Sequence, residues 1–349
     1  MDFLFWETGS GNRSRAAKLI SYLLTHSFLT VVYVGKKPHY QIKHLIPRKM
    51  DFIMLEDEVP SDRSKNIELI RKLMEVNRYK ACIIEYIHLS YFLKSIPDET
   101  LSILDTHDIV SESNESFKKA GLKNHAFEIS KEKEYKIYSL YDYVVFISQN
   151  DFQRSLPFLE KKKMLCIPHS PQIKFLPVSP RVQTIGFVAS NYTPNILGIE
   201  WFLTSVWPLV KNDALQLHII GAICAEINPE LIDHRTVLKH FQPNLEEVYN
   251  TLDILINPVN IGAGLKIKNV EALAFGKPLI TTPHSGGSLG NGYDECVKVV
   301  QTPMDFANAI NELCENHAYR RDLSEKAYDF AHTHYNEERC YGELNNMII

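Results

Sequence analysis

The stretch that decides the fold lies in the last third of the chain. It reads Asp253-Ile-Leu-Ile-Asn-Pro-Val-Asn-Ile-Gly-Ala-Gly-Leu-Lys-Ile-Lys-Asn-Val-Glu-Ala-Leu-Ala-Phe-Gly-Lys-Pro-Leu-Ile-Thr-Thr282. A short apolar run, a glycine-rich loop, a run with apolar residues at helical spacing, a turn and a second apolar run follow one another. This order predicts a strand, a loop, a helix and a second strand, which is the repeating unit of a parallel α/β sheet.

The loop 262–264 ends just before two lysines and a glutamate. Its flexible backbone, a helix N-terminus and the ammonium groups of Lys266 and Lys268 could together bind a diphosphate. Glu271 lies one helical turn beyond Lys268, where its carboxylate could accept hydrogen bonds from both hydroxyls of a ribose. A solvated Lys/Glu pair on an amphipathic helix would give the same pattern, so the residue types alone leave both interpretations open.

The α/β pattern extends outward over the whole chain. In the second half, strands are predicted at 184–188, 216–221, 254–257 and 278–281, and the segment 304–349 is predicted to be mainly helical. In the first half, strands are predicted at 3–6, 29–34, 82–85, 103–104 and 143–148, with helices at 13–25 and 67–76. Two Rossmann-like domains are therefore expected.

The length of the chain also favours two domains, because 349 residues exceed what one hydrophobic core usually organises. The proline-containing segment 175–181 reads as an irregular connection. We predict an N-terminal domain at 1–172, a linker at 173–182 and a C-terminal domain at 183–334. We expect the last residues, 335–349, to form a helix that packs back on the N-terminal domain.

Composition excludes several classes of function. Hydrophobic residues make up 45% and charged residues 23%, as in a folded globular protein. The net charge of −4 gives no overall positive field for nucleic acid. The six cysteines lack metal-ligand spacing, so we expect reduced thiols rather than a zinc site or a disulfide framework. Without a signal-like start or a long apolar run, a cytoplasmic protein is expected, with any membrane contact peripheral.

A second glycine loop follows the predicted first strand. Gly9 and Gly11 precede the first helix and would let the backbone approach a ligand closely. The third glycine of a dinucleotide-binding fingerprint is missing, which disfavours a hydride-transfer enzyme. An ordinary strand-to-helix turn would look the same.

The stretch 262–282 resembles the donor-site signature of family-four glycosyltransferases, known as glycosyl transferases group 1. Other segments resemble that family in the same order along the chain. They are 185–195, 198–202, 206–208, 217–221 and 245–258 in the second half, and 104–111 and 143–148 in the first. The resemblance implies the GT-B architecture, in which two Rossmann-like domains face each other across a deep cleft. The N-terminal domain would bind the acceptor and the C-terminal domain a nucleotide-diphosphate sugar.

The resemblance also implies roles for individual residues. Glu271 would hold the donor ribose, and Lys266 or Lys268 would meet the diphosphate with the loop that carries Ser190, Asn191 and Asn195. The donor site implied in this way comprises Gly9, Gly11, Ser190, Asn191, Asn195, Gly262, Ala263, Gly264, Leu265, Lys266, Lys268 and Glu271.

His107 is the residue of the first half that the resemblance places against the transferred sugar. With Lys266 and Glu271 it makes up the expected catalytic set. Asp105 and Asp108 would orient its ring or bind acceptor hydroxyls, and cap or strand-end roles suit them equally well. Arg13 is expected to meet a charged acceptor, although a solvated arginine fits the sequence too.

One position departs from the family pattern. Many members carry a further glutamate eight residues before the one matched by Glu271, and this chain has Ala263 there. Backbone amides of the loop would then replace the missing carboxylate. Retention of the anomeric configuration is the family expectation.

No cofactor is expected, and the chain lacks the Asp-x-Asp pair that binds a metal in GT-A enzymes, so metal independence is predicted. The donor would be a sugar linked to UDP, GDP or dTDP, and the acceptor a glycan or a lipid-linked glycan on the inner face of a membrane. Two alternatives stay open. One is a GT-B relative with other chemistry, such as a sugar-nucleotide epimerase, and the other is a catalytically silent partner of a second transferase.

Overall fold

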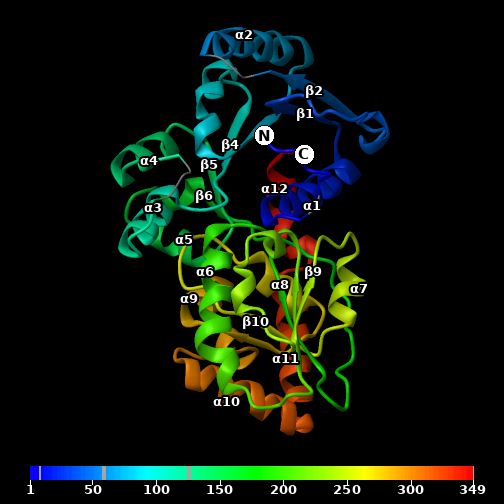
Figure 1. Ribbon diagram of the computed structural model, residues 1–349. Coiled ribbons are helices and arrows are strands. Elements are labelled where there is room, and N and C mark those ends of the chain that lie inside the picture. The colour runs from blue at the N-terminus through cyan, green and yellow to red at the C-terminus, as the bar shows by residue number, and fades with distance from the viewer. Residues whose placement is uncertain (8, 57–59, 124–126, 349) are drawn as a thin grey trace. The chain divides into compact units, whose positions relative to one another are not determined.

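The computed structural model describes residues 1–7, 9–56, 60–123 and 127–348. The chain divides into two compact units, each drawn in Figure 1. Unit 1 comprises residues 1–7, 12–168 and 340–349, and unit 2 comprises residues 8–11 and 169–339. Both units are built from parallel strands covered by helices, so the α/β fold class is confirmed.

Unit 1 contains a two-stranded and a four-stranded parallel sheet, in the orders β1-β2 and β3-β4-β5-β6. Its strands are β1 (Leu29–Val34), β2 (Met50–Leu55), β3 (Ala81–Glu85), β4 (Leu101–Asp105), β5 (Tyr143–Phe146) and β6 (Met164–Cys166). Its helices are α1 (Gly11–His26), α2 (Pro60–Asn77), α3 (Val110–Lys119), α4 (Lys131–Tyr138), α5 (Gln149–Ser155) and α12 (Glu337–Ile348). The C-terminal helix α12 belongs here, because Tyr341 packs its ring 5.2 Å from that of Tyr22.

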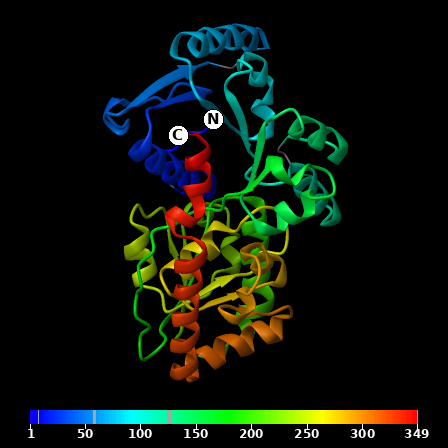
Figure 2. The same cartoon turned by 180° about the vertical axis from the view of Figure 1, so that it is seen from behind.

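Unit 2 contains one six-stranded parallel sheet in the order β12-β11-β10-β7-β8-β9. Its strands are β7 (Thr184–Val188), β8 (Gln216–Ile220), β9 (Thr236–Lys239), β10 (Ile254–Asn257), β11 (Leu279–Thr281) and β12 (Lys298–Val299). Its helices are α6 (Thr193–Trp201), α7 (Leu245–Asn250), α8 (Ile267–Ala274), α9 (Pro283–Gly286), α10 (Pro303–Glu315) and α11 (His317–His334). Seen from behind, α11 runs along one side of this sheet (Figure 2).

Local sequence explains where these helices begin. The hydroxyl of Thr302 accepts a hydrogen bond from the backbone N–H of Asp305, and Pro303 follows it as the first residue of α10. Both features favour a helix start at that point. Asn244 caps α7 in the same way, through the backbone N–H of Glu247.

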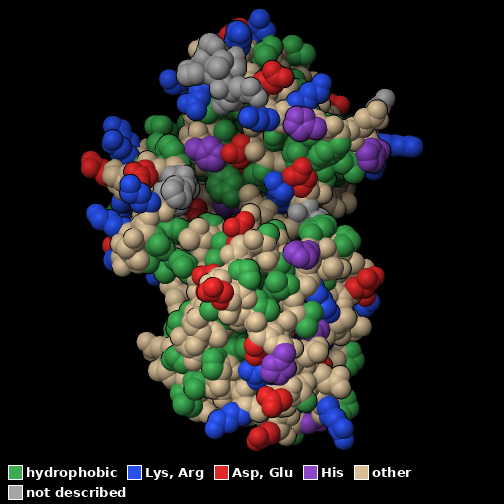
Figure 3. Space-filling view, viewed as in Figure 1, with side chains coloured by type: hydrophobic (Ala, Val, Ile, Leu, Met, Phe, Trp, Pro, Cys, Tyr) green, Lys and Arg blue, Asp and Glu red, His purple; other side chains and the backbone are tan. Residues whose placement is uncertain are grey.

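On the face of the molecule drawn in Figure 3, acidic and basic side chains are interspersed.

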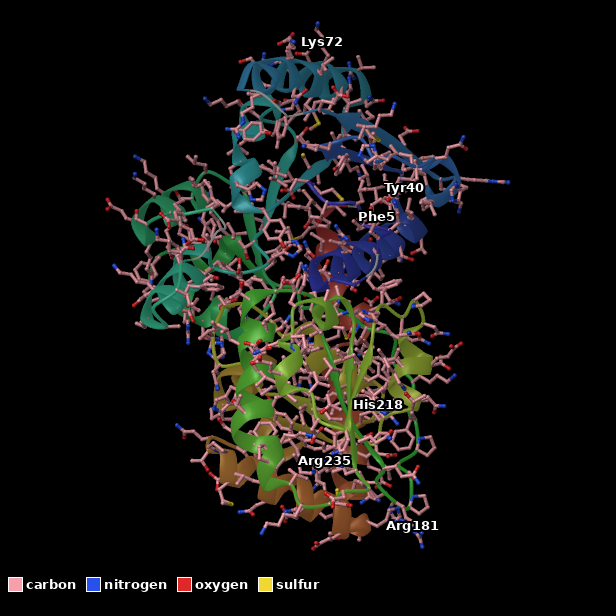
Figure 4. All side chains as sticks on the ribbon, viewed as in Figure 1. Phe5, Tyr40, Lys72, Arg181, His218 and Arg235 are labelled. Atoms are coloured by element: carbon pink, nitrogen blue, oxygen red, sulfur yellow. The ribbon has the colours of Figure 1, made fainter. Side chains whose placement is uncertain are left out.

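The predicted first strand at 3–6 is wrong. Residues Phe3 to Trp6 form a turn, in which the backbone N–H of Glu7 donates to the carbonyl of Leu4. Their aromatic side chains pack among themselves and with neighbours rather than alternating across a sheet, as Phe5 does against Trp6 at 4.9 Å. Trp6 also donates to the hydroxyl of Tyr40, which is labelled with Phe5 in Figure 4. The other predicted strands are confirmed.

The turn after β8 makes a strong prediction about stability. Gly221 has φ of +114°, and a Cβ at this position would lie 2.3 Å from the carbonyl oxygen of Ala189. Gly221→Ala therefore adds a backbone clash to a strained conformation, and should destabilise unit 2 by about 3 kcal/mol. The expected fall in Tm is roughly 6–12 °C by calorimetry.

Gly292 provides the matched control. It also has a positive φ, of +80°, but the nearest atom to an added Cβ is 3.9 Å away, on Phe330. Gly292→Ala should cost only the backbone strain, about 1 kcal/mol. Equal losses of Tm in the two variants would contradict the packing argument at Gly221.

Candidate nucleotide-sugar site

The sheet of unit 2 changes direction between β7 and β10. From β7 the chain builds outward through β8 and β9, and from β10 it builds the other way through β11 and β12. At such a switch point, the loops that leave the carboxyl ends of the two central strands separate and form a ligand-binding crevice. The loop after β7 carries Ser190 and Asn191 and leads to Asn195 in the first turn of α6, and the loop after β10 leads through residues 262–264 to α8.

A lysine side chain connects the two segments that follow β7 and β10. The ammonium group of Lys268, in the first turn of α8, donates a hydrogen bond to the side-chain oxygen of Asn195 in α6. The amide of Asn195 in turn donates to the backbone carbonyl of Ser190, at 3.0 Å. The ammonium also lies 4.7 Å from the ring centre of Phe187, a cation–π contact. Burial, and secondarily the charge of Lys266, lower the pKa of Lys268 to about 7.

A buried glutamate follows one turn later on α8. Glu271 is 8% exposed, and its carboxylate accepts a hydrogen bond of 3.1 Å from the hydroxyl of Tyr249 on α7. The ring of Tyr249 stacks on that of Phe275 at 4.9 Å, which fixes the direction of the hydroxyl. Burial raises the pKa of Glu271 to about 7, although the Tyr249 hydrogen bond opposes the shift. A carboxylate and a cation are thus held side by side on one helix face.

The conformation of the glycine loop is stabilised by Lys266, which follows it in the sequence. Gly262 and Gly264 have φ of +99° and +70°, in the left-handed region that favours glycine. The ammonium of Lys266 turns back to the carbonyl oxygens of Ala263 and Gly264, at 2.8 and 3.3 Å. The backbone N–H of Lys266 donates to the hydroxyl of Ser288, at 3.2 Å. Lys266 therefore shapes the loop, while the half-buried Lys268 places its ammonium beside Asn195.

The remaining residues predicted for the donor site lie in the same unit. A Cβ at Gly11 would be 3.1 Å from the side chain of Ile267, and one at Gly9 would be 3.6 Å from the ring of Phe241. Gly11 thus lies next to the start of α8. Leu265 is buried and Asn191 is exposed.

His107 lies in unit 1, directly after β4. It is buried and has φ of +58°, a strained backbone conformation for a histidine. Its Nε2 lies 2.5 Å from a carboxylate oxygen of Glu85, at the end of the adjacent strand β3, and its ring stacks on Tyr86 at 4.2 Å. Burial alone lowers the pKa of His107, but the Asp105 charge and the Glu85 hydrogen bond raise it above its ordinary value.

Asp105 is engaged by an arginine. Arg15 of α1 lies 2.7 Å from the Asp105 carboxylate, and both side chains are almost fully buried. Glu85 is the hydrogen-bond partner of the His107 ring, and Asp105 acts on that ring through its charge. Glu85, Asp105 and His107 have candidate metal-ligand atoms within 4.8 Å of one another. Arg15 already neutralises Asp105, so these residues form an internal ion-pair network.

Several residues that contact the predicted site residues were not predicted from the sequence. Tyr249, Ser288 and Glu85 give no motif, since each acts through a contact made by folding. Glu85 had the clearest signal, as a carboxylate at the end of an otherwise apolar strand. Arg13, predicted to meet an acceptor, lies 2.9 Å from Glu7 and is about one-third exposed.

Comparison with known proteins finds a family match within unit 2. Residues 182–316, which include both loops of the switch point, match the family model described as glycosyl transferases group 1. Unit 2 contains a group 1 glycosyltransferase domain. The resemblance seen in the sequence is therefore confirmed for this domain. An uncharacterized 44.6 kDa protein in the cps region of Klebsiella pneumoniae is 24% identical over 298 residues, which cover 78% of this chain and 74% of that protein.

Comparison with solved structures confirms the GT-B fold over nearly the whole chain. Sucrose-phosphate synthase from Thermosynechococcus elongatus matches with a TM-score of 0.77 and 14% identity, covering 97% of this chain and 92% of that one. HepE from Anabaena, solved with UDP and glucose, matches with a TM-score of 0.73 and 12% identity, covering 97% and 96%. In the described part of this chain, no helix is long and apolar enough to cross a membrane.

Proposed function

We propose that this chain transfers a sugar from a nucleoside-diphosphate sugar to a glycan or lipid-linked acceptor. The observation that carries the proposal is the pairing of Lys268 with Asn195 across the switch point, one helical turn from the buried Glu271. In the proposed complex, the diphosphate lies against Lys268 and the N-terminus of α8, and Glu271 accepts hydrogen bonds from the ribose. The group 1 match and the nucleotide in HepE support this donor class.

The proposed chemistry needs stabilisation of the leaving group. As the bond between sugar and phosphate breaks, negative charge grows on the nucleoside diphosphate, and Lys268 and the helix N-terminus stabilise it without a metal. His107 is proposed to contact the transferred sugar, and the configuration of its anomeric carbon is proposed to be retained. The acceptor is proposed to lie on the inner face of a membrane. The sequence similarity to a protein of a cps region is consistent with this proposal.

A panel of ligands tests the proposal. We expect UDP, GDP or dTDP, at about a hundred times its Kd, to stabilise the protein by about 2.7 kcal/mol and to raise Tm by several degrees. Adenosine and inorganic phosphate are the controls and should give no comparable shift. Release of nucleoside diphosphate from the matching sugar nucleotide then separates a transferase from a silent binding partner. If none of the three nucleoside diphosphates raises Tm, the proposal is wrong.

The pH dependence of binding provides a further prediction. A bound diphosphate favours the charged form of Lys268 and so raises its pKa above the value of about 7. Deprotonation of Lys268 then weakens affinity as pH rises, by about tenfold between pH 7 and 8.5, whereas protonation of Glu271, whose pKa is also about 7, weakens it as pH falls below 7. Titration calorimetry with the best nucleotide measures this fall. Lys268→Met should bind more weakly and lose the fall in affinity above pH 7, and an unchanged fall in that variant would contradict the assignment.

A further inference from the structure

A cavity lies inside unit 1, and Glu85, the hydrogen-bond partner of His107, is one of the residues that line it. Its volume is about 430 Å³, and its walls come from α1, α2, β1 and β3, with Ile348 at the end of α12. Apolar side chains dominate the walls, among them Leu19 and Leu23 of α1 and Ile70 and Met74 of α2.

Two strand edges face this cavity. A strand that lines a cavity with one face contributes alternate residues, because successive side chains point to opposite faces. Here β3 contributes the consecutive residues 81–85 and β1 the consecutive residues 29–32. Both strands therefore present an edge, where backbone N–H and C=O groups lie. β1 and β3 are also terminal strands of their respective sheets.

Backbone hydrogen bonds show which residues point inward. The carbonyl of Lys80 and the N–H of Tyr86 bond to β4, so alternation directs the backbone groups of Ala81, Ile83 and Glu85 toward the cavity. On β1, the N–H of Gly35 bonds to β2, so the even-numbered residues such as Thr30 and Val32 face the other way, into the cavity.

Met1 already occupies one end of this space as a strand would. Its amino group donates to the carbonyl of Val32 at 3.1 Å, and its carbonyl accepts from the N–H of Val34 at 2.9 Å. This is the pattern of a parallel strand paired with β1. Figures 1 and 2 both show the N-terminal end between β1 and the strands of the other sheet.

We propose that the gap between β1 and β3 is a slot for an extended apolar segment of polypeptide, about four residues long. Such a segment would run parallel to both strands, continue the pairing begun at Met1 and join the two sheets of unit 1 into one. Residues 29–32 of β1 span about 10 Å, which four extended residues fill. A segment of protein fits better than an acyl chain, because only a backbone offers partners to the inward N–H and C=O groups.

Two fusions test the slot. In one, Ile-Val-Ile-Val is attached directly before Met1, and in the control Ser-Asn-Ser-Asn takes its place. Attachment supplies the segment at high effective concentration. We expect the apolar fusion to raise Tm by at least 5 °C over the control. Amide hydrogen exchange at Thr30, Ala81 and Ile83 should slow at least tenfold, because those N–H groups gain partners.

Two further measurements keep the test decisive if a fusion folds poorly. The unfused chain is mixed with the free peptide Lys-Lys-Ile-Val-Ile-Val, which should slow exchange at the same amides, and separately with laurate. Equal Tm and exchange in the two fusions, with no effect of the free peptide, would overturn the proposal. So would stabilisation by laurate without protection of those amides, since that result describes an acyl pocket.

Discussion

Replacing Glu271 with alanine is expected to weaken binding of the preferred nucleoside diphosphate by at least about 100-fold. Two charge-assisted hydrogen bonds to a ribose diol would be lost, and hydrogen bonds to charged groups contribute about 1.5–3 kcal/mol each. The hydroxyl of Tyr249 would also lose its partner at 3.1 Å and with it part of the site's shape. Titration calorimetry, with the thermal shift as a second readout, measures the loss.

Two controls separate a binding role from a structural one. Glu271→Gln keeps the size and one acceptor oxygen, so it should retain the fold and lose most of the affinity. Glu325→Ala removes an exposed carboxylate of the same unit, 3.6 Å from Arg321, and should change the affinity less than twofold. Full binding by folded Glu271→Ala would show that the ribose assignment is wrong.

His107→Asn is expected to lower the rate of sugar transfer by about 100-fold while leaving nucleotide affinity within twofold. Asparagine tolerates the positive φ of this position better than alanine, so the backbone should keep its conformation. Its shorter side chain cannot reach the place that the imidazole ring holds, so stabilisation of charge on the transferred sugar is lost. Steady-state kinetics with the sugar nucleotide found by the ligand panel gives the rate.

Glu85→Gln gives the companion measurement. Glu85 is expected to act through His107, since its carboxylate holds Nε2 of the ring and helps to raise the pKa of that histidine. The variant should lower the pKa at which activity changes, and a simple loss of folding would not produce that shift. Wild-type rates in His107→Asn would remove His107 from the reaction.

Much of the fold could be predicted because the signals are local. The strands at 29–34, 184–188 and 254–257 have the predicted bounds, since each is a short β-rich run bounded by turn or loop residues. The segment 3–6 carries the same signal and is not a strand. Within the described residues 1–7, Met1 alone has backbone hydrogen bonds to β1, and the aromatic residues that follow are held by side-chain packing, which periodicity does not encode.

The candidate site was predictable in part for the same reason. Lys268 and Glu271 are neighbours on one helix, so their spacing along the sequence places them on one face. The partners that tune them come from elsewhere in the chain. Asn195 lies 73 residues before Lys268 and Tyr249 lies 22 residues before Glu271. The resemblance suggested Asn195, and nothing in the sequence suggested Tyr249.

A crystal structure with the nucleoside diphosphate that gives the largest thermal shift tests the central claim most directly. The account predicts a phosphate oxygen within about 3 Å of the Lys268 ammonium and both ribose hydroxyls within the same distance of the Glu271 carboxylate. A nucleotide bound elsewhere on the protein, with neither residue in hydrogen-bonding distance, would contradict it.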